Sequence, residues 1–240
     1  MKKPKTPLET APALRLGRNL TYGLLDAIGR AIVVGDYKSH DFPTEGELAE
    51  QHGVSRQVTR EAVKMLAAKG MLSARPKHGT FLQPDENWNL FDQDVLRWLL
   101  DRKFSISTLR HFNELRRAVE PQAAALAAIR GTAAQVSAIA EGLARMRTAE
   151  KGLGDTLEAD IAFHVAVLRA SGNPFLAQFK DVVTTALRTS IRFTNRIAGR
   201  TASVADHAAV YKAIARHDAD GASRAMKHLI DEVLTLIEKS

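Results

Sequence analysis

The chain has 240 residues, of which 45% are hydrophobic and 25% are charged, values typical of a globular protein with one large domain or two ordinary ones. Its formal charge is +7. Residues 1–84 carry 13 basic and 8 acidic residues, whereas residues 85–240 carry 21 and 19. Most of the positive charge thus lies in the first third of the chain, which indicates a polyanionic partner for that part. Cysteine is absent, which excludes thiol chemistry. No run approaches the roughly 18 apolar residues of a membrane span, and Met1–Ala13 lacks the apolar part of a secretory signal. We therefore expect a cytoplasmic protein without a membrane partner.

The first predicted elements form a three-helix unit with a hairpin. Residues 1–18 are polar and rich in proline, and we expect a flexible arm. Apolar residues at helical spacing predict a helix from Leu20 to Gly35. A second helix follows Thr44, which has capping-box spacing to Glu47, and it ends before a glycine turn at residue 53.

Ser55 is the predicted N-cap of a third helix, which runs from Arg56 to about residue 69. Two short extended pieces, residues 71–75 and 80–82, flank a Pro/Gly turn and predict a hairpin. Residues 19–84 therefore read as a winged helix-turn-helix.

The remainder of the chain predicts an all-α domain. Residues 85–91 are polar and read as a linker, while residues 92–240 contain few glycines or prolines and repeat apolar residues at three and four. We expect a bundle of about six or seven helices. The predicted fold is mainly α, with an N-terminal winged helix-turn-helix and a C-terminal helical bundle.

Polar side chains crowd the start of the third helix, which in a helix-turn-helix enters the major groove and reads base edges. Basic and close-approach residues at the wing tip suit a neighbouring minor groove or phosphate. An ordinary helical hairpin with a solvated face is the alternative, which the added wing and local charge disfavour. The candidate DNA contacts are Ser55, Arg56, Gln57, Thr59, Arg60, Lys77, His78 and Gly79.

Residues 48–62 (LAEQHGVSRQVTREA) closely resemble the signature of the GntR family of bacterial repressors, and residues 75–81 (RPKHGTF) resemble that family's wing. The resemblance covers about residues 20–84. It implies base contacts from Arg56 and Arg60 and a wing that reads through His78 and Gly79. One departure concerns Gly46, because many members carry a DNA-contacting arginine in that segment.

The helical domain holds an aspartate and a histidine four residues apart, Asp160 and His164, which share one helix face. Such a pair can ligate a divalent metal. His207 and His228 lie on later helices. On spacing alone, an ordinary surface contact is the favoured interpretation.

The segments ELRRAVEP (114–121), DIAFH (160–164) and NP (173–174) resemble the FadR-type C-terminal domain, or FCD. Members with this pattern bind a metal through one Asp and three His, often with a carboxylate effector. The resemblance implies a divalent ion, zinc first and nickel or manganese as alternatives, on Asp160, His164 and His207. His228 maps poorly, because it lies two residues after Met226 where the family has three.

Arg116 is the candidate anchor for a carboxylate effector, because a guanidinium binds a carboxylate in a bidentate manner; a helix-surface arginine is the alternative. Residues 87–98 (NWNLFDQDVLRW) are similar to the linker of repressors that respond to galactonate and related sugar acids. The linker helix is expected to pack against the bundle.

The sequence thus predicts a homodimeric transcription regulator, not an enzyme, that binds a double-stranded DNA operator and a small carboxylate. Two alternatives stay open. One is a DNA-binding protein whose helical domain only dimerises. The other is a metal-dependent hydrolase, which would need a general base such as Glu beside the ligands; Glu158 lies on another helix face.

Overall fold

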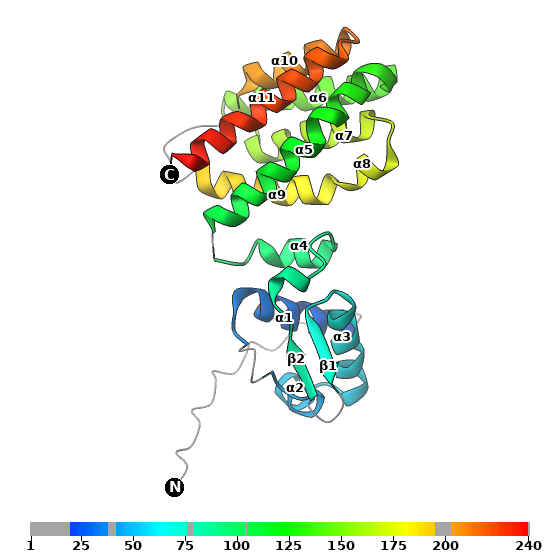
Figure 1. The fold of residues 1–240 in the computed structure, drawn as a ribbon, viewed down its shortest axis with the longest axis vertical. Helices are drawn as coiled ribbons and strands as arrows, with labels where there is room; N and C mark the ends of the chain where they lie inside the picture. Colours follow the sequence, from blue (N-terminus) through cyan, green and yellow to red (C-terminus); the bar gives the residue numbers. More distant parts are fainter. Residues whose placement is uncertain (1–19, 38–41, 76–78, 104, 195–202, 240) are drawn as a thin grey trace. The chain divides into compact units, whose positions relative to one another are not determined.

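The computed structural model describes residues 20–37, 42–75, 79–103, 105–194 and 203–239 and divides into two compact units (Figure 1). One unit ends at Lys103, and the other covers residues 104–240. Among the described residues, no helix is long and apolar enough to cross a membrane. The predicted arm, residues 1–18, lies outside the described residues.

The first unit begins with the three predicted helices, α1 (Leu20–Val34), α2 (Glu45–His52) and α3 (Arg56–Ala68). The capping box before α2 is formed, since the Thr44 amide donates to Oε2 of Glu47 at 2.8 Å and the Glu47 amide donates back to the Thr44 hydroxyl. Gly53 adopts φ +64°, a left-handed conformation that glycine enters without strain, and this allows the tight turn into α3.

The predicted wing is an antiparallel hairpin of β1 (Leu72–Arg75) and β2 (Gly79–Leu82), with Leu72 opposite Leu82 and Arg75 opposite Gly79. Leu72 is buried and Leu82 half-buried in the unit's core, so one end of the hairpin is anchored. Residues 76–78 lie outside the described residues.

The 3-10 turn η1 (Asp85–Asn87) and helix α4 (Gln93–Leu99) belong to the first unit, and the predicted boundary between residues 91 and 92 is wrong. The Trp98 side chain of α4 is fully buried in the core beside α1. Its indole N–H donates to Oδ1 of Asp26 at 2.8 Å, and its ring lies against Gly29. The apolar residues Val95 and Trp98 of this helix, which were expected to face the bundle, are instead buried in the core of the first unit.

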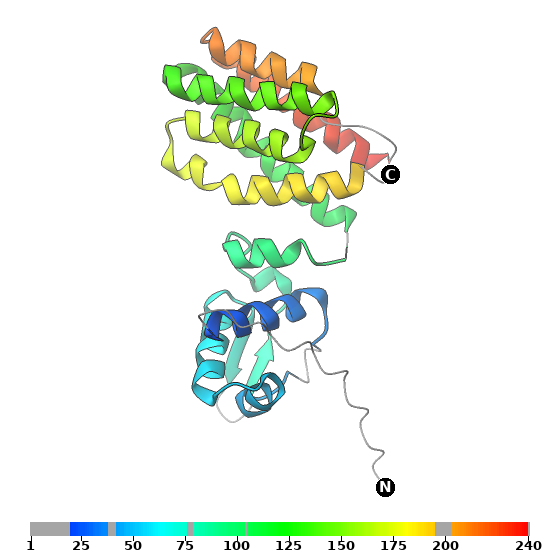
Figure 2. The same cartoon turned by 180° about the vertical axis from the view of Figure 1, so that it is seen from behind.

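The second unit is the predicted helical bundle, and Figures 1 and 2 show its helices from two sides. Its longest helix, α5, packs against α11, α7, α9 and α10, and α6 lies between α7 and α10. The described helices are α5 (Ile106–Arg130), α6 (Ala133–Glu150), α7 (Thr156–Ala170), α8 (Pro174–Gln178), α9 (Lys180–Thr194), α10 (Val204–Ala215) and α11 (Ala219–Glu238).

Two helices of the bundle approach closely at Gly142 of α6. A Cβ atom on this residue would lie 2.9 Å from Cα of Phe163 in α7. The missing side chain thus lets α6 pack on the helix that carries Asp160 and His164. Most of the bundle core is aliphatic or aromatic, but it also encloses a group of polar side chains on α5, α7 and α10.

Candidate functional site

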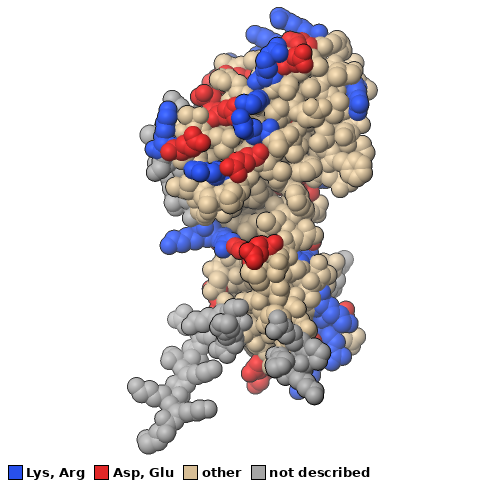
Figure 3. Space-filling model, viewed as in Figure 1, with Lys and Arg blue, Asp and Glu red and all other residues tan. Residues whose placement is uncertain are grey.

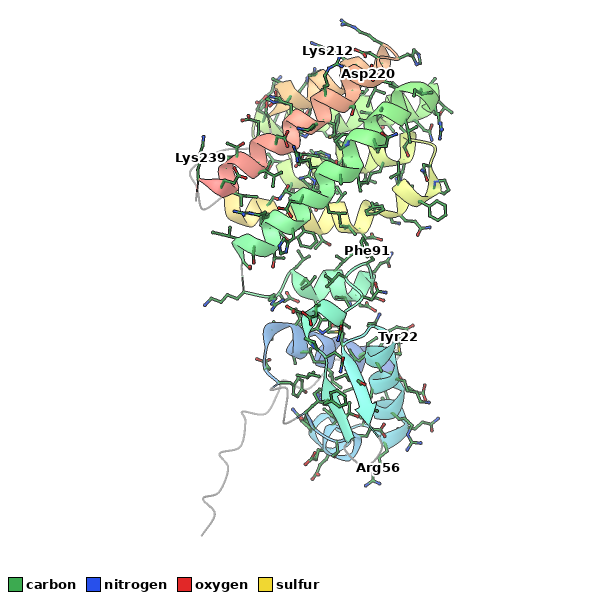
Figure 4. The ribbon with its side chains drawn as sticks, viewed as in Figure 1. Tyr22, Arg56, Phe91, Lys212, Asp220 and Lys239 are labelled. Atoms are coloured by element: carbon green, nitrogen blue, oxygen red, sulfur yellow. The ribbon has the colours of Figure 1, made fainter. Side chains whose placement is uncertain are left out.

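The first turn of α3 presents three of its polar side chains to solvent. Ser55 caps the helix through a hydrogen bond from the Val58 amide at 3.3 Å, and Arg56, Gln57 and Arg60 are exposed. Arg56, the first residue of α3, points away from the unit in Figure 4. Figure 3 shows Lys and Arg side chains along the edge of the unit that carries this helix. The helix start combines exposed donors with the partial positive charge of its free N–H groups.

Thr59 does not share that face, and the prediction that it contacts DNA is wrong. Its side chain is fully buried, and its hydroxyl donates to the Ser55 carbonyl at 3.3 Å. Ala62, Val63 and Leu66 are buried at the spacing of one helix face, and Thr59 is the first member of that face. This periodicity is visible in the sequence, but Thr59 was grouped with the exposed polar residues because its side chain is polar.

Both arginines of α3 lie close to α2. Nε of Arg60 is 3.4 Å from Oε2 of Glu45, and both side chains are substantially exposed. Gly46 leaves space in front of α2, since a Cβ there would meet only Nη2 of Arg56, at 4.0 Å, and the Thr44 hydroxyl, at 3.9 Å. The Arg56 guanidinium therefore lies next to Gly46, the position at which the family resemblance led us to expect an additional arginine.

At the wing, Gly79 adopts φ +81° and opens β2, so this position favours glycine for conformational reasons. Lys77 and His78 lie outside the described residues, and their predicted DNA contacts stay predictions.

A second candidate site lies inside the bundle, where Asp160 and His164 of α7 meet His207 of α10. One potential ligand atom from each residue lies within 4.8 Å of the others. Oδ1 of Asp160 is 2.9 Å from Nε2 of His207 and 3.5 Å from Nε2 of His164, and the two Nε2 atoms are 3.3 Å apart. Both imidazoles are buried.

Each imidazole engages its other nitrogen outside this group. Nδ1 of His207 lies 2.7 Å from the Ser203 carbonyl, and since a carbonyl only accepts, Nδ1 carries the proton. Nδ1 of His164 contacts Oε2 of Glu120 on α5. Such outer partners commonly fix the tautomer of metal-binding histidines and leave Nε2 facing the ion. Glu120 was missed in the sequence, although its i,i+4 spacing from Arg116 was a visible signal.

The atoms that face one another fit a cation. Oδ1 of Asp160 is buried and accepts no hydrogen bond of normal geometry. With both Nδ1 atoms engaged, each Nε2 offers a lone pair unless it is protonated. Three electron-rich atoms within 3.5 Å of one another require a positive charge among them, either a proton or a metal ion.

Without a metal ion, a proton on His164 is the favoured source of that charge, because the surroundings of this imidazole raise its pKa. Burial alone would lower the pKa of His164, but the charge of Glu120 and the contacts with Asp160 and Glu120 raise it to about 9 against the opposing charge of Arg116. Burial would raise the pKa of Asp160, but its contacts with both histidines hold it well below the ordinary value. Burial likewise opposes ionisation of Glu120, yet Arg116 and His164 lower its pKa to about 2.

Arg116 lies in this site and is not a surface side chain. Its side chain is 2% exposed and its Nε donates to Oε1 of Glu120 at 2.6 Å. Nη1 donates to Asn113 at 3.3 Å, and Nη2 lies 3.3 Å from Nε2 of His164. Its neighbour Arg117 is half exposed and pairs with Asp231 of α11.

His228 is not part of the group, and the prediction that it is a ligand is wrong. Its side chain is exposed on α11, whereas the other three candidates are inside the bundle. The residue three positions after Met226 is Leu229, which is buried. One residue corresponds to about 100° of helix rotation, so the one-residue difference noted in the sequence places His228 on the outer face.

Glu158 also lies outside the group, as predicted, since it pairs with Arg188 of α9 at 2.6 Å. Glu120 is the carboxylate beside the ligands, and both of its oxygens are engaged, one by Arg116 and one by His164.

Comparisons with known proteins identify the family to which the chain belongs. The profile described as "Bacterial regulatory proteins, gntR family" matches residues 22–82, and the profile "FCD domain" matches residues 112–232. The chain is 35% identical to the Escherichia coli "Uncharacterized HTH-type transcriptional regulator YieP" over 92% of its length and 96% of that protein. It is 31% identical to the E. coli "Galactonate operon transcriptional repressor" over 88% of its length and 94% of that protein.

A solved structure of E. coli McbR/YncC has the same fold, with a TM-score of 0.51, 17% identity and coverage of 92% of this chain and 97% of that one. The two profile matches and the relatives that are more than 30% identical agree with the winged first unit and the helical second unit. The chain belongs to the GntR family of bacterial transcription regulators, in the group with an FCD domain, and it is a DNA-binding regulator, not an enzyme.

Proposed function

We propose that this regulator binds its operator through the leading turn of α3 and that its bundle senses a small carboxylate beside a divalent metal. The main support for the sensing role is the geometry inside the bundle, where Oδ1 of Asp160 lies close to the Nε2 atoms of His164 and His207. Zinc is the favoured ion, because it accepts two imidazoles and one carboxylate at short distance; nickel and manganese are alternatives. The three residues would hold the ion and leave coordination positions for an effector oxygen.

Charge balance supports an anionic effector. Arg116 contributes one positive charge, and Glu120 and Asp160 contribute two negative charges. These three charges sum to −1, and a proton on His164 brings the metal-free site to zero. A divalent ion that takes the place of this proton gives a total of +1, and one carboxylate returns the total to zero. Buried charges are stable only when compensated, so the metal-loaded site favours a monoanion. Nη2 of Arg116 would orient that carboxylate.

A sugar acid is the proposed effector class, on two grounds. Residues 87–98 resemble the linker of galactonate-responsive repressors, and one relative is the repressor of a galactonate operon. The metal would act as the electrophilic partner of the carboxylate. The remaining hydroxyls of the sugar acid would select among related compounds.

We also propose that the chain acts as a homodimer on an inverted-repeat operator. Arg56, Gln57 and Arg60 would read base edges, Ser55 and Gly79 would approach the DNA backbone, and Lys77 and His78 would contact the adjacent groove or phosphates. An arginine can make a bidentate contact to guanine, worth about 1–3 kcal/mol of discrimination.

A ligand-panel thermal shift tests the sensing role. The metal-free protein is measured alone, with zinc, and with zinc plus sugar acids that include galactonate; galactose, which lacks the carboxylate, is the matched control. True ligands raise the melting temperature by mass action. A melting temperature unchanged by every metal and acid would favour a bundle that only dimerises. Light scattering and selection of operator sequences from random DNA test the dimer and the DNA-binding role.

A further inference from the structure

The two oxygens of Glu120 hold two different parts of the bundle site. Oε2 contacts Nδ1 of His164, and Oε1 accepts from Nε of Arg116 at 2.6 Å. Glu120 is fully buried on α5, one helical turn after Arg116. No other described carboxylate of the bundle contacts both residues.

We propose that Glu120 is the positioning residue of this site: it fixes His164 as the Nδ1–H tautomer with Nε2 toward Asp160, and it holds Arg116 beside that nitrogen. This inference rests on the proposed metal site. Glu120 is not itself a ligand, because both of its oxygens are directed to Arg116 and His164 and neither lies in the group of three ligand atoms.

The arrangement needs a carboxylate at residue 120. His164 Nδ1–H and Arg116 Nε–H are both donors, so residue 120 must accept twice on two separate oxygens. Glutamine has a single acceptor oxygen, and its amide N–H₂ would face the remaining donor. A Glu120→Gln variant therefore loses either the hold on the imidazole or the hold on the guanidinium.

The second consequence concerns the strength of the ligand. A carboxylate that accepts from Nδ1–H increases electron density at Nε2 and restricts ring rotation. His164 has no alternative acceptor for Nδ1–H among the described residues. Nη2 of Arg116 lies 3.5 Å from Nδ1, but a guanidinium only donates, and the contacts with Asp160 and His207 are at Nε2. His207 obtains the corresponding restraint from a backbone carbonyl, so it does not depend on Glu120.

The test is calorimetric titration of zinc alone into the metal-free full-length protein at one fixed pH. We expect Glu120→Gln to weaken zinc binding about 10- to 100-fold, the usual effect of losing an outer partner. Glu114→Gln is the matched control, because Glu114 is exposed on the same helix, and its zinc affinity should equal that of the unmodified chain. Folding of each variant is checked by circular dichroism.

Glu120→Asp keeps the negative charge and both acceptor oxygens, so the buried Arg116 guanidinium still has a counter-charge. The side chain is shorter by one methylene, so it reaches His164 less well. This variant should fold and still bind zinc more weakly than the unmodified protein. Zinc affinities of both variants within twofold of the unmodified value would overturn the inference.

A further measurement uses the unmodified protein. Nitrogen-15 NMR of its zinc-loaded imidazoles should give His164 as protonated at Nδ1 and metal-bound at Nε2; zinc on Nδ1 of His164 would overturn the inference directly. If the unmodified chain binds no zinc, the proposed metal site fails and not only the role of Glu120. If it binds zinc through His164 Nε2 and the Glu120 variants do also, with equal affinity, the role of Glu120 alone fails.

Discussion

Nε2 of His207 lies 2.9 Å from Oδ1 of Asp160, while Nδ1 of the same ring is held by the Ser203 carbonyl 2.7 Å away. The ring is therefore fixed with its lone pair toward the carboxylate. We predict that His207→Ala reduces zinc affinity by more than about 100-fold, beyond the effect of losing an outer partner, because a ligand itself is removed. Calorimetric titration measures this.

His228→Ala is the matched control for this experiment, since His228 is exposed on α11 and outside the ligand group. Its zinc affinity should equal that of the unmodified chain. Equal zinc binding by the His207 and His228 variants would contradict the assignment of the site.

We predict that Arg56→Ala and Arg60→Ala each weaken specific operator binding by about 10- to 100-fold, the range that corresponds to one lost bidentate contact. Both side chains are exposed at the start of α3, so the fold should be unaffected. Electrophoretic mobility shifts with a selected operator give the affinities. Arg145→Ala, which removes an exposed arginine from α6, is the control and should bind like the unmodified chain. Full affinity in both α3 variants would argue against this helix as the DNA reader.

The metal-free protein should lose stability as the pH rises from about 6.5 to about 9. The folded pKa of His164 is raised to about 9, above its ordinary value of 6.5. The folded state therefore binds the proton more tightly than the unfolded chain does, and this stabilisation is complete below pH 6.5 and is lost as the pH passes the folded pKa.

Thermal melts in the presence of a chelator measure this effect. A His164→Gln variant removes the titrating group and should show a flatter profile across the same pH range. An unmodified protein with a constant melting temperature from pH 6.5 to 9 would show that His164 is not protonated in the buried group.

We predict that Gly29→Ala destabilises the first unit by about 1–3 kcal/mol, the usual cost of overpacking a core. A Cβ on residue 29 would lie 2.3 Å from the Trp98 ring, so α4 must move away from α1. Denaturant unfolding followed by tryptophan fluorescence gives the change. Gly46→Ala is the control, because its Cβ would meet only ordinary contacts at 3.9 and 4.0 Å. Equal stability of the two variants would contradict tight packing of α4.

The sequence predicted the winged unit almost completely, because its caps and turns are local features. Thr44, Gly53 and Ser55 mark helix ends through hydrogen bonds that span three or four residues. Asp160 and His164 could be paired for the same reason.

What the sequence did not reveal depends on contacts between distant segments. Trp98 enters the core of the first unit through an aspartate 72 residues earlier, and no local pattern indicates that choice. Glu120 on α5 contacts His164 on α7, and the whole of α6 lies between these two helices in the sequence. Thr59 and His228 were misassigned for a local reason, because their polar residue type was given more weight than the helix periodicity that places Thr59 on the buried face and His228 on the outer face.

Docking of α4 on α1 determines where this protein can be cut. A fragment that stops at residue 84 would lack Val95 and Trp98 and would leave apolar surface of the first helix in water. A fragment that extends to Lys103 keeps that surface covered. An isolated DNA-binding piece for operator studies should therefore end after α4, and chimaeras that exchange helical bundles between relatives should join there.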